Sequence, residues 1–91
     1  MYKEISFEWD VEKEKSNIYK HGIDFVTASE AFIDPRRKII IDSKHSKTEE
    51  RLFCLGKARG KILTVRFTYR EGVIRIIGAG FWRGGKSHYE K

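Results

Sequence analysis

The spacing of hydrophobic and polar residues changes along the chain from a strand pattern to helical patterns and then back to strands. At the start, Ile5, Phe7 and Trp9 alternate with polar residues, which predicts a strand with one buried face. Helical signals occupy residues 10–34, and strand patterns return after Arg37. We therefore predict an α+β fold of two layers, in which one strand and two helices are followed by four further strands.

Two helices are predicted from capping residues and from an apolar stripe. Asp10 can cap the first helix, and Gly22 suits the left-handed backbone conformation that ends it. Asp24 can cap the second helix, and Pro35 stops it. The first helix is mostly charged, so it should lie on the surface. The second has an apolar stripe formed by Phe25, Ala28, Ala31 and Phe32.

The second half of the chain predicts one strand over residues 38–42 and then a meander of three. Two-residue turns at Arg59-Gly60 and Glu71-Gly72 join the strands of the meander. These strands cover residues 50–57, 61–70 and 73–79. Alternation along them places most apolar side chains on one face, which both helices can cover. The expected core residues are Leu52, Cys54, Leu63, Val65, Phe67, Tyr69, Ile74 and Ile76.

The opposite face of the same strands carries arginines. The turns align Arg51, Thr68 and Arg75 in one row across three strands, with Arg66 one step along the same face. A guanidinium group matches the geometry of phosphate oxygens, so this face predicts contact with a phosphate backbone. In the alternative interpretation, each arginine pairs with a nearby carboxylate. The carboxylates considered for this pairing are Glu49, Glu50 and Asp42.

The formal net charge of +6 comes from the second half of the chain. Residues 1–50 hold nine Lys and Arg against eleven Asp and Glu, whereas residues 51–91 hold ten against two. A basic surface of this density attracts nucleic acids or acidic protein segments. A soluble face without a partner is the simpler alternative.

Several classes of protein are disfavoured. The 91 residues predict a single domain over residues 1–91, and no apolar run approaches the roughly 20 residues of a membrane span. The charged N-terminus does not resemble a secretion signal, and a single cysteine suits a reducing cytoplasm. Cys54 falls on the core face, so we do not expect it to be a nucleophile. His21, His45 and His88 lie in separate segments, so we expect no metal and no other cofactor.

Cleavage of RNA is compatible with these residues, because the 2′-hydroxyl group of the substrate is the nucleophile. The protein must supply groups for proton transfer and cations that stabilise charge on the phosphate. Arg75 and Arg51 are candidates for the cations. The candidates for proton transfer are His21, Lys20 and Glu50, with a weaker case for His88. His21 has a simpler interpretation, in which it only closes the first helix. Candidates for RNA binding are Arg66, Arg70, Arg83 and Trp82, the last by stacking on a base.

The segment FEWDVEKEKSNIYKHGIDF, residues 7–25, resembles the opening of BrnT-type toxins, a branch of the RelE-like toxins. The segment VIRIIGA, residues 73–79, matches the same family. Other matching positions are Trp9, Asp10, Lys13, Asn17, Lys20, His21, Gly22, Phe25, Glu49, Glu50, Arg51 and Gly56. The resemblance covers most of the chain and implies a RelE-like two-layer fold.

The resemblance also implies a function and partners. BrnT-type toxins belong to type II toxin–antitoxin pairs, so it implies a metal-independent endoribonuclease that cleaves messenger RNA, free or on the ribosome, and inhibits translation. It implies a BrnA-like antitoxin with a ribbon-helix-helix DNA-binding part. The sequence departs from the family in its tail, where Gly78 replaces a serine and Gly80 an arginine. Arg83 is a candidate to substitute for that arginine.

The tail also raises an alternative function. Gly84 and Gly85 disfavour the C-terminal helix that is usual in the family, so we predict no helix after residue 80. A protein without the arginine and the helix could be a catalytically degenerate module that binds RNA or antitoxin and acts in autoregulation.

Overall fold

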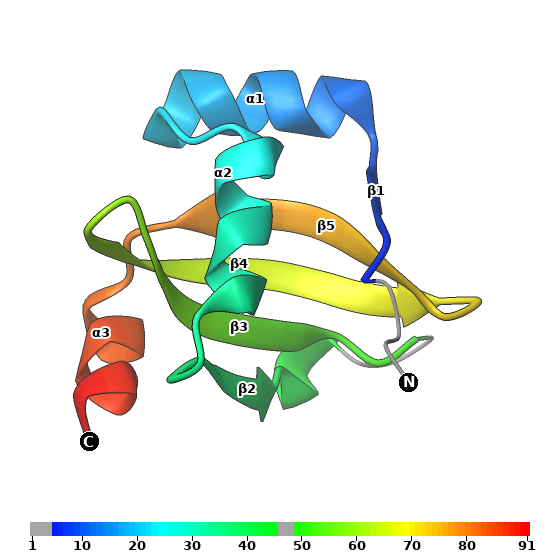
Figure 1. The fold of residues 1–91 in the computed structure, drawn as a ribbon. Coiled ribbons are helices and arrows are strands. Elements are labelled where there is room, and N and C mark those ends of the chain that lie inside the picture. The colour runs from blue at the N-terminus through cyan, green and yellow to red at the C-terminus, as the bar shows by residue number, and fades with distance from the viewer. Residues whose placement is uncertain (1–4, 46–48) are drawn as a thin grey trace.

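The computed structural model describes residues 5–45 and 49–91. Three helices and a five-stranded sheet make up these residues, and the α+β prediction is confirmed (Figure 1). The strands lie in the order β1-β5-β4-β3-β2, with β1 parallel to β5 and the other neighbours antiparallel. In chain order the elements are β1 (Phe7–Trp9), α1 (Val11–His21), α2 (Phe25–Glu30), the 3₁₀ turn η1 (Ala31–Ile33), β2 (Lys38–Ile41), the 3₁₀ turn η2 (Ser43–His45), β3 (Leu52–Ala58), β4 (Lys61–Arg70), β5 (Val73–Gly80) and α3 (Arg83–Glu90).

The predicted helix caps are present. The side chain of Asp10 accepts hydrogen bonds from the backbone N–H groups of Glu12 and Lys13, at 2.8 and 3.2 Å. Gly22 ends α1 in the left-handed conformation, with φ 69°. Asp24 caps α2 by accepting a hydrogen bond from the backbone of Thr27 at 2.7 Å. These caps fix the position at which α1 ends and the chain turns toward α2.

Both predicted two-residue turns have the left-handed backbone that tight hairpins require. The φ angles are 51° and 79° at Arg59-Gly60 and 53° and 78° at Glu71-Gly72. The turns therefore set the predicted register, in which Thr68 pairs with Arg75. A β-bulge opposite the step from Arg66 to Phe67 then shifts the pairing, so that Arg66 lies beside Gly78.

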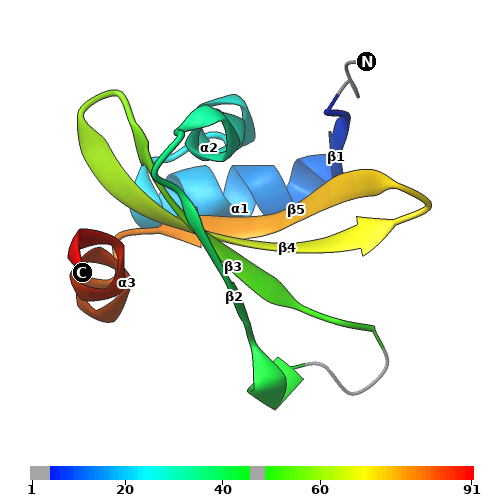
Figure 2. The ribbon, with the colours of Figure 1, turned by 60° about the horizontal axis from the view of Figure 1, so that its bottom comes forward.

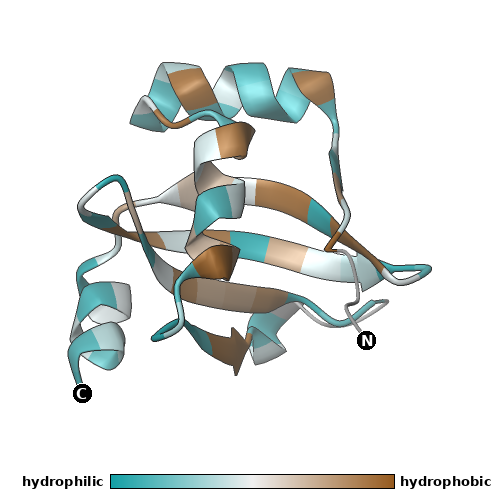
Figure 3. Ribbon diagram, in the orientation of Figure 1, coloured by the Kyte–Doolittle hydropathy of each residue, from teal (hydrophilic) through white to brown (hydrophobic). Residues whose placement is uncertain are grey.

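The helices α1 and α2 pack on one face of the sheet, as predicted (Figure 1). Figure 3 shows hydrophobic residues along the strands and hydrophilic residues over most of α1. Two expectations about the core were wrong. Tyr69 is 56% exposed, because it lies near the end of β4, where one edge of its ring packs on Phe67. Leu55, which was not expected in the core, is fully buried on the opposite face.

Leu55 is buried because the tail forms a helix, which contradicts the prediction from Gly84 and Gly85. The helix α3 lies on the side of the twisted sheet opposite α2 (Figure 2). A side chain at Gly85 would collide with the Thr64 hydroxyl and approach Leu55, so glycine allows α3 to pack closely on the sheet. Gly84 in turn leaves room for the indole of Trp82. Close packing thus outweighs the low helix propensity of the two glycines.

Side chains from other elements also fix α3. The hydroxyl of Tyr89 donates a hydrogen bond to Asp34 at 2.6 Å. The Lys38 ammonium group donates to the backbone carbonyls of His88 and Lys91, at 2.7 and 2.9 Å, and so satisfies the C-terminal end of the helix. One end of the arginine-bearing face is therefore covered by α3, although the whole face was expected to be uncovered.

Candidate functional site

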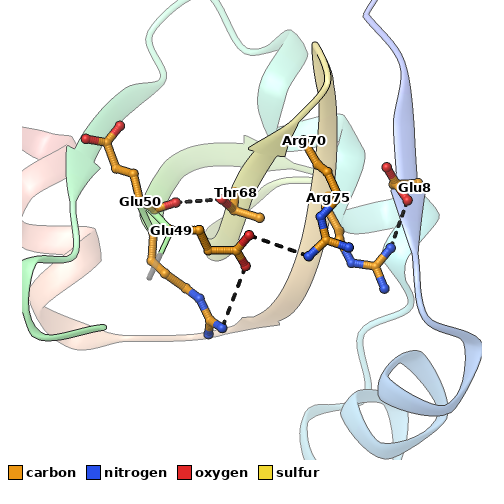
Figure 4. A network of polar contacts seen from close by, with 7 residues as sticks. Glu8, Glu49, Glu50, Thr68, Arg70 and Arg75 are labelled. Carbon is orange, nitrogen blue, oxygen red and sulfur yellow. Dashed lines mark hydrogen bonds and ion pairs between the residues drawn. The ribbon is translucent and has the colours of Figure 1, made fainter. Parts of the chain in front are cut away.

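The predicted row of arginines lies on one face, but carboxylates pair with its members. Arg75 and Glu8 form an ion pair at 2.8 Å, and Glu49 lies 3.5 Å from Arg70 and 3.9 Å from Arg51 (Figure 4). The interpretation in which arginines pair with carboxylates therefore describes this end of the sheet. We call Arg51, Arg70 and Arg75 the paired arginines.

The sequence had indicated Glu49 as a partner, but it had not indicated Glu8. Glu8 is the outward-facing residue of β1, and the parallel pairing of β1 with β5 places it beside Arg75. The alternation of Phe7, Glu8 and Trp9 indicates a strand with Glu8 on its polar face. It does not indicate which edge of the sheet that strand joins.

Arg66 occupies a different environment on the same face. The register places Phe53, Arg66 and Gly78 in one row, beside the row that contains Thr68 and Arg75. The guanidinium of Arg66 lies directly over Gly78, where an added Cβ atom would be only 2.8 Å from Nη2. No carboxylate lies within ion-pair distance of Arg66 in the described part of the chain.

His21 and Arg66 line the same hollow, which has a volume of about 580 Å³ and which we call the His21 hollow. His21 is the last residue of α1, and its ring lies next to Gly80, with Nδ1 3.7 Å from the position of an added Cβ atom. The two tail glycines of β5 therefore make room for the two side chains. The residues lining the His21 hollow are Asn17, His21, Asp42, Lys44, Phe53, Thr64, Arg66, Ala79, Gly80, Phe81 and Trp82.

Asn17 fixes the geometry of this hollow, a role that the sequence analysis missed. Its side chain accepts a hydrogen bond from the backbone N–H of Ala79 at 3.0 Å and donates one to the carbonyl of Ile23 at 2.9 Å. Asn17 is buried, one helical turn before His21. It therefore joins α1 and the turn after it to β5, at the residue between Gly78 and Gly80. The match of Asn17 to the BrnT pattern was the available signal in the sequence.

Aromatic rings form one wall of the His21 hollow. The indole of Trp82 packs on Phe53, with ring centroids 5.9 Å apart, and lies 6.5 Å from the ring of His88. Trp82 remains 48% exposed, although these rings and Gly84 hold it in place. An indole fixed in this way and partly open to solvent can stack on a base without a large loss of side-chain entropy.

Comparison with known families decides the identity. The profile of the family described as "Ribonuclease toxin, BrnT, of type II toxin-antitoxin system" matches residues 9–83. The chain belongs to the BrnT family. A comparison with curated proteins gave no match. As a BrnT family member, the protein is a ribonuclease toxin of a type II system, which implies an RNA substrate and an antitoxin partner.

The remaining candidate residues of this BrnT chain lie outside the His21 hollow. Lys20 is exposed on α1, and the carboxylate of Glu50 points away from Arg70 and Arg75 (Figure 4). The backbone carbonyl of Glu50 accepts a hydrogen bond from Thr68 at 2.6 Å. Arg83 begins α3, beyond the aromatic wall. The structure thus brings together His21, Arg66 and Trp82 from the predicted set.

The structure also bears on two other kinds of site in this BrnT protein. Cys54 is fully buried, and burial raises the pKa of its thiol to about 12, so the thiolate form that could act as a nucleophile is not populated near neutral pH. Among residues 5–45 and 49–91, no group of three or more His, Cys, Asp or Glu could hold a metal ion.

No helix in the described residues is long and apolar enough to span a membrane.

Proposed function

We propose that this BrnT family member is a metal-independent endoribonuclease that cleaves messenger RNA and so inhibits translation. The observation that supports this most is that His21 and Arg66 share one hollow on the basic face of a ribonuclease toxin. A proton-transfer group and a phosphate ligand are the two components that cleavage by a 2′-hydroxyl requires from the protein. The RNA chain would lie along the wall that Phe53 and Trp82 form.

In the proposed reaction, the 2′-oxygen of one nucleotide attacks the adjacent phosphorus while His21 accepts the proton of the 2′-hydroxyl group. The bond from phosphorus to the 5′-oxygen of the next nucleotide breaks, that oxygen takes up a proton from solvent, and a 2′,3′-cyclic phosphate remains. Arg66 stabilises the charge that develops on the phosphate oxygens, because its side chain lines the hollow and its guanidinium lies over Gly78. Lys44, which also lines the hollow, adds positive charge.

The paired arginines have a secondary role in this proposal. The row that contains Arg75 lies two residues along the strands from Arg66, a distance of about 7 Å. The contacts of Glu49 with Arg51 and Arg70 are long, at 3.9 and 3.5 Å, and partly exposed. Ion pairs at the surface contribute only about 0–1 kcal/mol, so a phosphate can compete with Glu49 for these two guanidinium groups more readily than with Glu8 for Arg75. Lys20 and Glu50 lie outside the His21 hollow, so they would transfer protons only if their own side chains moved into it when RNA binds.

The test is cleavage of messenger RNA by the purified protein in EDTA. We expect the wild type to cleave in EDTA and His21→Gln to be slower by about 10²–10⁴-fold, the usual contribution of a general acid or base. Lys15→Gln is the matched control, because Lys15 is exposed on the same helix and lies outside the hollow. Cleavage that EDTA abolishes, or that His21→Gln does not slow, would contradict the proposal.

A catalytically degenerate module remains the second candidate. It is favoured by the carboxylates that pair with Arg75, Arg70 and Arg51, and by the absence of a side chain at Gly80. In the same assay it predicts that neither the wild type nor His21→Gln cleaves RNA, and a separate binding measurement should give equal RNA affinity for both.

We propose that the antitoxin is a BrnA-like protein with a ribbon-helix-helix part and that it neutralises the toxin by covering the basic face. The ten basic residues after position 50 give this half of the chain its positive charge, so an acidic or apolar antitoxin segment would complement it. Co-expression with the protein encoded by the neighbouring reading frame should give a stable complex in which the His21 hollow no longer accepts RNA.

A further inference from the structure

A second hollow adjoins the His21 hollow and has no role in the mechanism above. It has a volume of about 710 Å³ and lies between α3 and the hairpin of β3 and β4. We call it the lysine hollow. The residues lining it are Lys57, Gly60, Lys61, Ile62, Phe81, Trp82, Arg83, Lys86 and Glu90.

The lysine hollow is strongly basic. Its lining includes three lysines and one arginine against the single carboxylate of Glu90, and all four cations are exposed. In the described residues, no carboxylate lies within ion-pair distance of any of these four cations. The Lys61 ammonium instead lies 5.6 Å from the centre of the Phe81 ring. The hollow therefore presents positive charge that no carboxylate of the described residues neutralises by an ion pair.

Phe81 and Trp82 line both hollows and form a ridge between them. Phe81 is 57% exposed and Trp82 is 48% exposed, so each ring has surface available for stacking. A single nucleic acid strand that fills the His21 hollow must cross this ridge to reach the lysine hollow. Cations on both sides of exposed aromatic rings are typical of surfaces that bind single-stranded nucleic acid.

We propose that the lysine hollow is a second substrate site, which binds the phosphates of the single-stranded RNA segment adjoining the cleaved nucleotides. Lys57, Lys61 and Lys86 contact these phosphates, and the rings of Phe81 and Trp82 stack on bases at the crossing. The inference rests on the proposed function in taking RNA as the ligand. RNA is favoured over a protein because the lysine hollow continues the hollow that contains His21 and Arg66.

The experiment measures binding of RNA oligonucleotides of graded length that carry 2′-O-methyl groups. These oligonucleotides lack the nucleophile, so binding is measured whether or not the protein cleaves RNA. The test variant is the triple substitution Lys57→Gln, Lys61→Gln and Lys86→Gln. The control is Lys13→Gln, Lys15→Gln and Arg36→Gln, which removes the same charge from exposed positions outside both hollows.

We expect the test variant to bind the shortest oligonucleotides as the wild type does and to lose at least about tenfold affinity for the longest ones. For the long oligonucleotides, the slope of log K against log salt should decrease by about 2, because each lost phosphate contact on a single strand accounts for about 0.7. The control should keep the dependence on length and lose little affinity.

Two outcomes would overturn the inference. One is a test variant that binds oligonucleotides of every length as tightly as the wild type. The other is a variant that keeps its RNA affinity but binds the antitoxin more weakly, which would make the lysine hollow a protein-docking surface. If the wild type cleaves no RNA but the lysines still govern the affinity for long oligonucleotides, the proposed function fails and this inference stands.

Discussion

The two ends of one sheet face use the same kind of side chain in different ways. At the end near the turn at Glu71-Gly72, Glu8 and Glu49 pair with Arg75, Arg70 and Arg51. Further along the same face, Arg66 lies over Gly78, with no carboxylate at ion-pair distance in the described residues. The difference is set by the neighbouring elements, because β1 and the segment before β3 supply acids, whereas β5 supplies glycines.

This comparison shows that an arginine on an exposed face is not by itself a phosphate ligand. A guanidinium that already contacts a carboxylate must lose that contact, or share it, before a phosphate can bind. Arg75 is the clearest case, because its side chain is only 23% exposed and its ion pair with Glu8 is short. The paired arginines are therefore less available to bind a phosphate than Arg66 and the cations of the lysine hollow are.

The largest expected effect is the difference in kcat/KM for RNA cleavage between Arg66→Ala and Arg75→Ala. We expect Arg66→Ala to lower kcat/KM by about 10²–10³-fold, as removal of a group that stabilises transition-state charge does. Arg75→Ala should lower it by about tenfold at most, because a carboxylate already neutralises much of the charge of Arg75. Steady-state kinetics on one RNA substrate measures both values.

The reverse order of these two effects would make the paired arginines the catalytic end. Arg36→Ala is a control for the loss of an exposed arginine, because Arg36 lies outside the His21 hollow and the lysine hollow. Thermal unfolding of each variant shows whether a loss of activity reflects a loss of folded protein.

A smaller effect is expected when Arg75 is released from its partner. Glu8→Gln removes the carboxylate but keeps the side-chain volume, so RNA should bind a few-fold more tightly. The slope of log K against log salt should become steeper by about 0.7, the value for one additional phosphate contact on a single strand. Uncleavable 2′-O-methyl RNA, titrated over a range of salt concentrations, measures both quantities.

The control for that release is Glu12→Gln, which removes an acid whose side chain is 82% exposed on α1. Equal gains from Glu8→Gln and Glu12→Gln would mean that only net charge matters and that the ion pair does not restrict Arg75. No gain from Glu8→Gln would mean that RNA does not reach the paired arginines.

The sheet register could be predicted because it follows from local signals. The turns at Arg59-Gly60 and Glu71-Gly72 and the alternation of apolar residues were enough to place Thr68 beside Arg75. The partner of Arg75 could not be predicted in the same way. Glu8 is 67 residues away in the chain, and only the parallel pairing of β1 with β5 brings it there.

The tail could not be predicted because tertiary packing outweighs local propensity there. Gly84 and Gly85 are poor helix formers, yet they are the residues that allow Trp82 and the sheet to approach α3. In the sequence, Gly78 and Gly80 appear only as the loss of a serine and an arginine that the family pattern has. In the fold, Gly78 lies against Arg66 and Gly80 lies against His21. A glycine that makes room for another side chain leaves no periodic signal in the sequence.

The smallest expected effect concerns pH and the docking of α3, which covers one end of the compared face. The hydrogen bond from the Tyr89 hydroxyl lowers the pKa of the Asp34 carboxyl below its ordinary value of 3.8, and backbone N–H groups add to this. A carboxyl whose pKa is lower in the folded state stabilises the fold above the pKa of the unfolded chain. That contribution is lost as the pH falls through the folded pKa.

The same contact raises the pKa of Tyr89 above its ordinary value of 10.0. A proton that the folded state binds more tightly stabilises the fold below the unfolded pKa, and this contribution is lost as the pH rises through the folded pKa. The hydrogen bond between Tyr89 and Asp34 should therefore stabilise α3 between about pH 4 and pH 10 and should contribute less on either side of this window.

Urea midpoints of the wild type and Tyr89→Phe across the pH range test this window. We expect the variant to unfold at slightly lower urea near neutral pH, with a difference that shrinks below about pH 4 and above about pH 10. Tyr19→Phe is the matched control, because Tyr19 is 91% exposed on α1 and should show no such dependence. A difference that stays constant down to low pH would show that the Tyr89 hydroxyl contributes independently of the charge on Asp34. Asp34 would then not hold α3 through its charge.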